Sequence, residues 1–280
     1  MASDSIITHL YDGKVEVKFF PESHIYYING KRNTGVTTYI GIKDKSRALT
    51  IWATELMRDH LLEAKVITPE LIYEACVLHE VRKKEAADLG TKIHDWIEQH
   101  IKHQIDPKKN AAPDMPEDNA VLIGVTGFLQ WEEVHAPKYK SSERIVYSKK
   151  HGYSGTLDIE ATIKGKLYLL DIKSSNGLYN TVNMQTAAYV KADEEESGKE
   201  YYGRWAIRIT KETEEEYLAR MQKKQKNDIQ KGKAPREIEP YVAFEAKLLD
   251  TDIDDDFKAF LACKTLYEWD KKTDYYTNKK

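Results

Sequence analysis

Two stretches on either side of one turn decide the fold: Thr156-Leu-Asp-Ile-Glu-Ala-Thr-Ile163 and Lys166-Leu-Tyr-Leu-Leu-Asp-Ile-Lys173. The first stretch alternates polar and apolar residues with the period of two that is typical of a strand, and the second is mostly apolar. Gly165, between two lysines, indicates a tight turn. Together these features predict an antiparallel β-hairpin. Pairing across the turn places Asp158 nearly opposite Asp171.

The polar residues of this hairpin point to a chemistry. Two carboxylates this close repel each other unless a cation lies between them. Asp171 ends an apolar strand, where an uncompensated charge is costly, and Lys173 points to the same side of that strand. Hard oxygen ligands bind Mg²⁺ or Mn²⁺, and a lysine can stabilise the charge that develops on a phosphodiester during hydrolysis. The alternative interpretation is a hairpin whose aspartates and lysine form ordinary surface ion pairs.

A second candidate group lies upstream, on a predicted helix. Ile93, Ile97 and Ile101 recur every four residues and predict a buried stripe. His94 and Glu98 have the same spacing beside that stripe, so both can face the sheet. A neutral imidazole is a good ligand for Mn²⁺, and a carboxylate suits Mg²⁺. The alternative is a core histidine beside a solvated or ion-paired glutamate.

A third candidate group is Gln185-Thr-Ala-Ala-Tyr189, on the helix that follows the Asp–Lys strand. Gln185 and Tyr189 lie one turn apart, and the two alanines between them allow close packing against the sheet. In a functional interpretation, Gln185 supports the lysine or a phosphate and Tyr189 packs behind it. The spacing fits an ordinary helix rich in small residues equally well.

The rest of the chain predicts further strands and helices. Together with the hairpin they indicate an α/β (α+β) architecture with a mixed sheet and flanking helices. Strands are expected at 15–20, 25–28, 36–40, 144–147, 201–209 and 241–246, and helices within 46–103 and at 118–134, 181–195, 212–230 and 253–269. We divide the chain into a β region (1–45), a helical region that carries the histidine (46–135), a core sheet and helix (136–210) and a helical extension (211–280). The four segments are expected to form one compact domain.

Composition limits the possible functions. The 280 residues are 41% hydrophobic and 32% charged, which is typical of a soluble globular chain. Cys76 and Cys263 are far apart with no CxxC neighbour, which argues against a disulfide framework and against a four-cysteine metal site. No apolar run approaches the roughly 20 residues of a membrane helix, and the first ten residues do not resemble a signal peptide. We therefore expect a cytoplasmic protein without a membrane partner. The net charge of −3 permits nucleic-acid binding without requiring it.

Four motifs occur in one order: Gly90-Thr-x-Ile-His-x-x-Ile-Glu98, Gly155-x-x-Asp158, Asp171-x-Lys173 and Gln185-x-x-x-Tyr189. In this order they resemble the RecB-like branch of the PD-(D/E)xK nuclease superfamily, which includes mitochondrial genome-maintenance, phage and bacterial exonucleases. The resemblance covers roughly 90–209, and Gly35-Val-Thr-Thr38 with Trp52 extends it loosely upstream. Leu157 stands where the superfamily name implies a proline, as is common in this branch. Iron–sulfur members of the branch use four cysteines, so no such cluster is expected.

The resemblance implies a restriction-endonuclease-like core of a mixed central sheet flanked by helices, with an N-terminal β/helical elaboration. It implies one or two Mg²⁺ or Mn²⁺ ions, and Lys173, Asp158 and Asp171 as catalytic residues. The implied metal ligands are His94, Asp158, Asp171 and the backbone carbonyl of Ile172, with Glu98 as a less certain one. Glu143 is a candidate for an acid that precedes the core. Gln185 and Tyr189 would support the site and contact DNA.

The function implied is a metal-dependent DNA exonuclease that acts from DNA ends in phage or bacterial recombination or repair. The expected partners are single-stranded or end-bearing DNA and a recombination or annealing protein. Four lysines flank the predicted site as candidates for phosphate contacts: Lys149, Lys150, Lys164 and Lys166. Two alternatives stay open, a structure-specific endonuclease with the same site and a non-cleaving nucleic-acid-binding module. The intact set of Asp158, Asp171 and Lys173 argues against the second.

Overall fold

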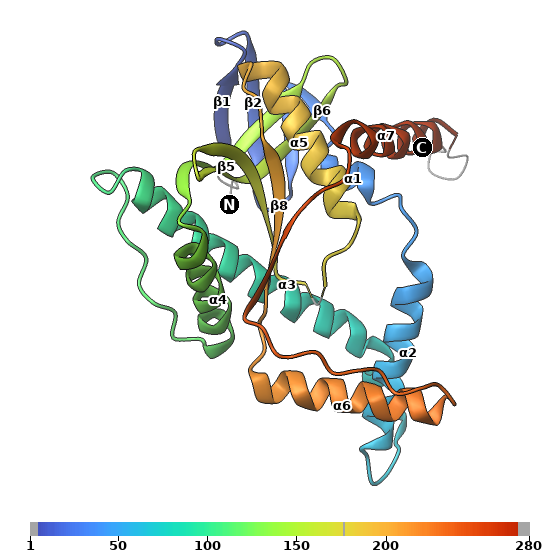
Figure 1. Cartoon of the computed structure of the whole chain (residues 1–280). Helices are drawn as coiled ribbons and strands as arrows, with labels where there is room; N and C mark the ends of the chain where they lie inside the picture. The colour runs from blue at the N-terminus through green and yellow to red at the C-terminus, as the bar shows by residue number, and fades with distance from the viewer. Residues whose placement is uncertain (1–4, 176, 274–280) are drawn as a thin grey trace.

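A five-stranded mixed sheet forms the centre of the computed structural model, which describes residues 5–175 and 177–273 (Figure 1). Its strands lie in chain order: β5 (Lys138–Ser148), β6 (Tyr153–Ile163), β7 (Lys166–Lys173), β8 (Gly203–Ile209) and β9 (Phe244–Leu248). Neighbouring strands are antiparallel except β7 and β8, which are parallel and are connected through helix α5 (Thr181–Ser197). The expected α/β class, a mixed sheet with helices on its flanks, is confirmed.

The β6–β7 hairpin has the predicted register. Ile163 pairs with Lys166 and Ile159 with Leu170, and the next positions in the same register are Asp158 and Asp171. Lys164 and Gly165 both have positive φ, at 50° and 80°. That conformation belongs to the two-residue turn whose twist matches the flanking strands.

One face of the sheet packs against helices α3 (Pro69–Ile105) and α4 (Asn119–His135). The predicted stripe of Ile93, Ile97 and Ile101 is buried in this layer together with Phe128 and Trp131 of α4. The last three turns or more of α3, from Ile93 onward, therefore lie against the sheet. This docking fixes the face of the helix on which His94 lies.

The opposite face packs against α5, the short helix α1 (Val36–Ile40) and the last helix, α7 (Ile253–Thr273). Phe260 of α7 is fully buried, and its ring lies 4.8 Å from that of Tyr153 on β6, centroid to centroid. Strand β9 lies at the edge of the sheet, beside β8. The segment 211–280 thus supplies both a strand and part of the core, in addition to the expected helices.

A second, antiparallel sheet precedes the core and packs against β5 through Ile145. Its strands are β1 (Ile6–Leu10), β2 (Val15–Phe20), β3 (Ile25–Ile28) and β4 (Lys31–Asn33). The strand expected at 36–40 is wrong, because this segment is helix α1. Val36, Tyr39 and Ile40 are all buried, and their helical spacing places them on one face against α5 and α7. Tertiary burial overrides the β-branched composition here.

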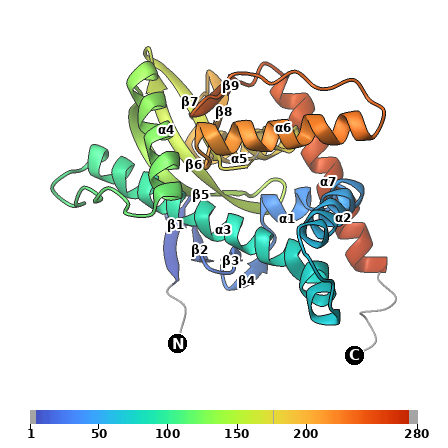
Figure 2. The ribbon, with the colours of Figure 1, turned by 90° about the horizontal axis from the view of Figure 1, so that it is seen from below.

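The expected helical region, 46–135, consists of α2 (Ser46–Leu62), α3 and α4. Thr68 accepts a hydrogen bond from the backbone of Leu71 and Pro69 begins α3, as the sequence predicted. No residue of α2 is buried. Helix α6 (Glu214–Gln230) extends toward α2 (Figure 2), and ion pairs of 2.9 Å and 2.5 Å join them: Lys223–Asp59 and Lys231–Glu55. None of the helices in the described ranges is long and apolar enough to span a bilayer.

Candidate functional site

The candidate site forms around Asp171, near the end of β7. This side chain has no exposed surface, and its Oδ1 has no hydrogen-bond partner among the described residues. The ammonium of Lys173 lies 2.6 Å from Oδ2 as an ion-pair partner. Burial raises the pKa of Asp171 to about 6, although Lys173 opposes the shift. The pair therefore joins a fully buried carboxylate to a half-buried ammonium and is not an exposed surface ion pair.

Asp158 lies beside Asp171 and is tied to the same strand. Its Oδ2 accepts a hydrogen bond of 2.8 Å from the backbone N–H of Ile172. Burial raises the pKa of Asp158, while Lys173 and this hydrogen bond oppose the rise. The Asp158 side chain thus continues the contact between β6 and β7 beyond their last paired residues. The proposed role of the Ile172 carbonyl as a ligand stays a prediction.

A third carboxylate comes from β5. Glu143 lies across from Asp158, at a gap in the β5–β6 pairing between Ser142–Ile159 and Arg144–Leu157, and it has a φ of 50°. Burial raises the pKa of Glu143 to about 9, and the charges of Asp158 and Glu98 add to the shift. The strand register therefore places Glu143 opposite Asp158, at a position where the backbone departs from regular strand geometry.

Helix α3 brings His94 and Glu98 to the same group. Burial and the charge of Lys173 lower the pKa of His94 to about 4, so the imidazole is neutral at pH 7 and keeps a free lone pair. Glu98 forms an ion pair with Lys102 on the next turn. Glu98 also contributes to the raised pKa of Asp95, whose main cause is burial. The charges of Asp171 and Lys173 act on His94, as its predicted orientation toward the sheet requires. The ion pair of Glu98 lies along its own helix, so the orientation of Glu98 stays a prediction.

Gln185 and Tyr189 lie behind the aspartates, on α5. Gln185 Nε2 donates to Tyr189 Oη at 3.1 Å, and Tyr189 is buried. Gly155 explains how close the two elements come, because a Cβ there would lie 2.4 Å from the Tyr189 ring. The glycine of the Gly-x-x-Asp motif is thus needed for packing.

Two further contacts at the site involve Tyr26 and Ser174, which the sequence motifs did not mark. Tyr26 of β3 shares a hydrogen bond of 2.8 Å with the Thr156 hydroxyl, and burial with the charge of Glu143 raises its pKa to about 12. Gly90 of α3 faces Ser174, where a Cβ would lie 2.8 Å from Oγ. Neither contact has a sequence signal, because both join elements that are distant in the chain.

The four candidate lysines do not border the carboxylates. They are Lys149, Lys150, Lys164 and Lys166. They lie at the turns before and after β6. At least five strand residues separate each of them from Asp158, which corresponds to roughly 17 Å or more at 3.3 Å per strand residue. Two of them lie over aromatic rings. The Nζ of Lys149 is 3.7 Å from the centroid of the Tyr11 ring, and the Nζ of Lys166 is 3.6 Å from that of Tyr202. Their expected position flanking the site is wrong, because the site is in the middle of the strand. Their contact with DNA stays a prediction.

The donor atoms at the site fit a hard divalent cation, although they are not arranged as a complete metal site. Within residues 5–175 and 177–273, no three His, Cys, Asp or Glu side chains converge closely enough to hold an ion. The fit rests on Asp171, whose buried Oδ1 has no hydrogen-bond partner among the described residues, and on the neutral imidazole of His94. Carboxylate oxygens and an imidazole suit Mg²⁺ or Mn²⁺. Binding would require the Lys173 ammonium to move off Asp171.

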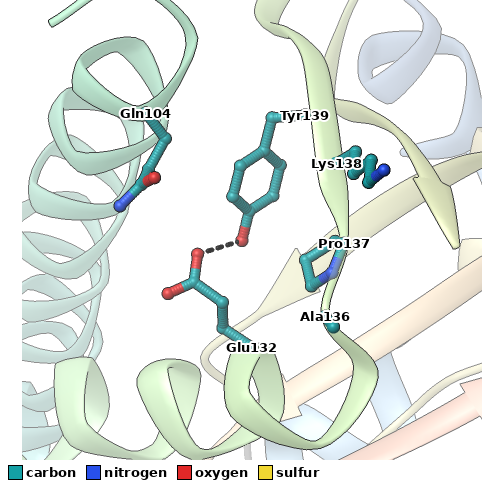
Figure 3. Close-up of a pocket in the computed structure, with 6 residues that line it drawn as sticks. All are labelled: Gln104, Glu132, Ala136, Pro137, Lys138 and Tyr139. Atoms are coloured by element: carbon teal, nitrogen blue, oxygen red, sulfur yellow. Dashed lines mark hydrogen bonds between the residues drawn. The ribbon is translucent and has the colours of Figure 1, made fainter.

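A separate cavity of about 390 Å³ lies where α4 ends and β5 begins (Figure 3). It is lined by Gln104, Glu132, Ala136, Pro137, Lys138 and Tyr139. Glu132 accepts a hydrogen bond from Tyr139 Oη at 2.7 Å. It also accepts one from His100 at 3.0 Å when Nε2 of His100 carries the proton. Because this carboxylate is fully engaged, the cavity offers a structural network rather than a reactive group.

Comparisons with known proteins leave the chain without an assigned family. No family model matches it, and no curated protein matches its sequence. Among solved structures, the crystal structure of SSO0001 aligns with a TM-score of 0.26 and 14% identity, over 79% of this chain and 87% of that chain. Similarity at this level carries no argument about fold or function.

Proposed function

We propose that the protein is a Mg²⁺- or Mn²⁺-dependent DNA exonuclease of the RecB-like kind. The observation that carries the proposal is the group of fully buried Asp171 and half-buried Asp158 and Lys173, with His94 and Glu143 beside it. Burying several like charges with one lysine is costly for the fold. Strongly perturbed groups gathered at one place are typical of functional sites.

The residues divide into three roles in this proposal. Asp158, Asp171 and His94 would hold the ion, which when bound neutralises charge on the phosphodiester and lowers the pKa of water. Lys173 would release Asp171 and place its ammonium where negative charge develops on the phosphate. Gln185 and Tyr189 hold the strands in place from behind, through the contact of Tyr189 with Gly155.

The direct test is a time course on end-labelled linear DNA, single- and double-stranded, with Mg²⁺, Mn²⁺ or EDTA. We expect cleavage with either metal and none with EDTA. Asp171→Asn and Lys173→Ala should each lower the rate by at least about 100-fold, since each removes a group that acts on the transition state. Lys31→Gln, which changes an exposed lysine of β4, is the control and should leave the rate unchanged.

The same assay separates the alternatives. Closed circular DNA should resist an exonuclease, and its cleavage would indicate an endonuclease with the same site. DNA binding with no cleavage under any metal would indicate the non-cleaving module and would overturn the proposal. Full activity of Lys173→Ala would remove Lys173 from the mechanism.

A further inference from the structure

A small pocket lies directly after Lys173, at the carboxyl ends of the parallel strands β7 and β8. Its volume is about 80 Å³, and it is lined by Ser174, Ser175 and the residues 208–212. In open α/β sheets, ligands bind at the carboxyl ends of parallel strands. The pocket therefore occupies a position suited to binding, next to the candidate catalytic lysine.

Lys211 is the distinctive residue of this pocket. Its ammonium donates to the backbone carbonyl of Ala86 on α3 at 3.2 Å. Within the described part of the chain, no carboxylate lies within ion-pair distance of it. Burial lowers the pKa of Lys211, and its charge helps to lower the pKa of His94. A partly buried cation of this kind gains stability from an anion.

The other charges of the pocket are already compensated. Arg208 Nε lies 2.9 Å from a carboxylate oxygen of Glu245 on β9. Both carboxylate oxygens of Glu212 accept hydrogen bonds from Arg220. Among the charged residues that line the pocket, Lys211 is thus the one whose charge no described neighbour compensates. An anion bound in the pocket would compensate it.

A serine hydroxyl makes the pocket suitable for a phosphate. This hydroxyl is that of Ser174, because Ser175 Oγ already donates to the carbonyl of Gly177 at 2.8 Å. Ser174 and Ser175 follow Lys173 directly and line the pocket beside Lys211. Ser174 Oγ fits against α3 because position 90 is a glycine, as described above. Hydroxyl and ammonium groups are the donors that proteins most often direct at the phosphates of nucleic acids.

We propose that this pocket binds a phosphate of the nucleic-acid strand next to the phosphate that is cleaved, and that Lys211 supplies the charge that holds it. The inference rests on the proposed function, because it assumes that the strand passes Lys173. The phosphate is either internal or terminal, and the chemistry of recognition is the same for both. Lys211 binds substrate in this proposal and has no part in bond breaking.

Binding of a fluorescent single-stranded oligonucleotide in EDTA tests the inference without requiring cleavage. Lys211→Gln keeps a hydrogen-bond donor and removes the charge. We expect it to weaken binding about 5- to 10-fold and to lower the slope of log K against log salt by roughly 0.7, the single-strand value for one phosphate contact. Lys211→Arg should restore most of the affinity, and Lys31→Gln should bind like wild type.

Oligonucleotides with and without a terminal phosphate identify the source of the anion. A loss of affinity that is equal for both assigns an internal phosphate, and a loss confined to the phosphorylated one assigns a terminal phosphate. In the cleavage assay, Lys211→Gln should raise KM and leave kcat within about threefold.

Unchanged affinity and salt slope for a folded Lys211→Gln would overturn the inference, and so would a fall in kcat with KM unchanged. A merely structural link from Lys211 to Ala86 predicts a lower unfolding temperature for Lys211→Gln with no change in salt slope. An absence of cleavage by wild type with either metal defeats the proposed function, whereas the salt slope reports on the pocket separately.

Discussion

Asp158 and Gly155 both help to position the elements of the site, in addition to the metal-binding role that we propose for Asp158. Asp158 accepts a backbone hydrogen bond from β7 at the point where regular pairing ends, so it helps to hold Asp171 in position. Gly155, three residues earlier, lets β6 approach the ring of Tyr189. One short motif therefore fixes the distance between two strands and the distance between the sheet and α5.

We predict that Gly155→Ala destabilises the protein by about 1–3 kcal/mol, since the added methyl overlaps a buried aromatic ring in a close-packed core. Urea denaturation measures the difference. Gly177→Ala is the matched control, because its Cβ would meet no atom within 4 Å and should change stability by less than about 0.5 kcal/mol. Equal stability of Gly155→Ala and wild type would contradict the packing described for Tyr189.

At the scale of elements, a carboxylate network joins α3, α4 and β5. Glu132 of α4 lies within hydrogen-bond distance of His100 of α3 and accepts from Tyr139 of β5. Burial by itself raises the pKa of Glu132, but the hydrogen bonds from His100 and Tyr139 outweigh burial and lower the pKa below its usual 4.5. A depressed pKa in the folded state stabilises the protein above the usual pKa, and this contribution is lost as the pH falls below it.

We therefore predict that Glu132→Gln costs about 1–3 kcal/mol at pH 7, and that its cost shrinks as the pH falls below 4.5. Urea denaturation of both proteins between pH 7 and pH 3.5 measures the difference. Glu133→Gln, on an exposed neighbouring position, should show no such dependence. A cost that stays constant across this range would show that the charge of Glu132 does not stabilise the fold.

Local patterns predict some of these elements, while others form only through tertiary contacts. The β6–β7 register follows from a period of two and one turn, both of which are local, and so it was predictable. The α3 stripe was predictable for the same reason. Helix α1 was not, because its burial depends on α5 and α7, over a hundred residues later.

The same limit applies to the candidate site. The positions of Asp158, Asp171 and His94 could be argued from spacing within one hairpin and one helix. The strand position and backbone turn of Glu143, the contact of Tyr26 and the pocket of Lys211 each depend on how distant segments meet. The sequence analysis also placed the four lysines at the ends of β6 beside the site, because it did not take into account the distance that the residues of β6 span.

For the molecule as a whole, the last helix is part of the core. Phe260 of α7 has no exposed surface and packs on Tyr153 of β6 and Tyr39 of α1. A buried arginine adds a second link, because Arg204 of β8 lies 2.7 Å from Asp256 of α7. The layer behind the carboxylates therefore includes segments from both ends of the described chain.

We predict that Phe260→Ala costs about 3–5 kcal/mol of unfolding free energy, since it empties a fully buried aromatic position. Leu266→Ala is the control on the same helix, where the side chain is 50% exposed, and should cost less than about 1 kcal/mol. Chemical denaturation compares the two variants. Similar small costs for both would mean that α7 is not docked as described.

The docking of Phe260 has a consequence for synthesis in the cell. Translation is vectorial, and domains generally fold as units. A ribosome must translate about a hundred residues beyond Tyr153 before Phe260 can pack on its ring. A chain that stops before residue 260 would already carry the acidic residues of the hairpin, yet it would lack the aromatic packing behind them. We therefore expect the group of carboxylates to take its final arrangement only after α7 has been made.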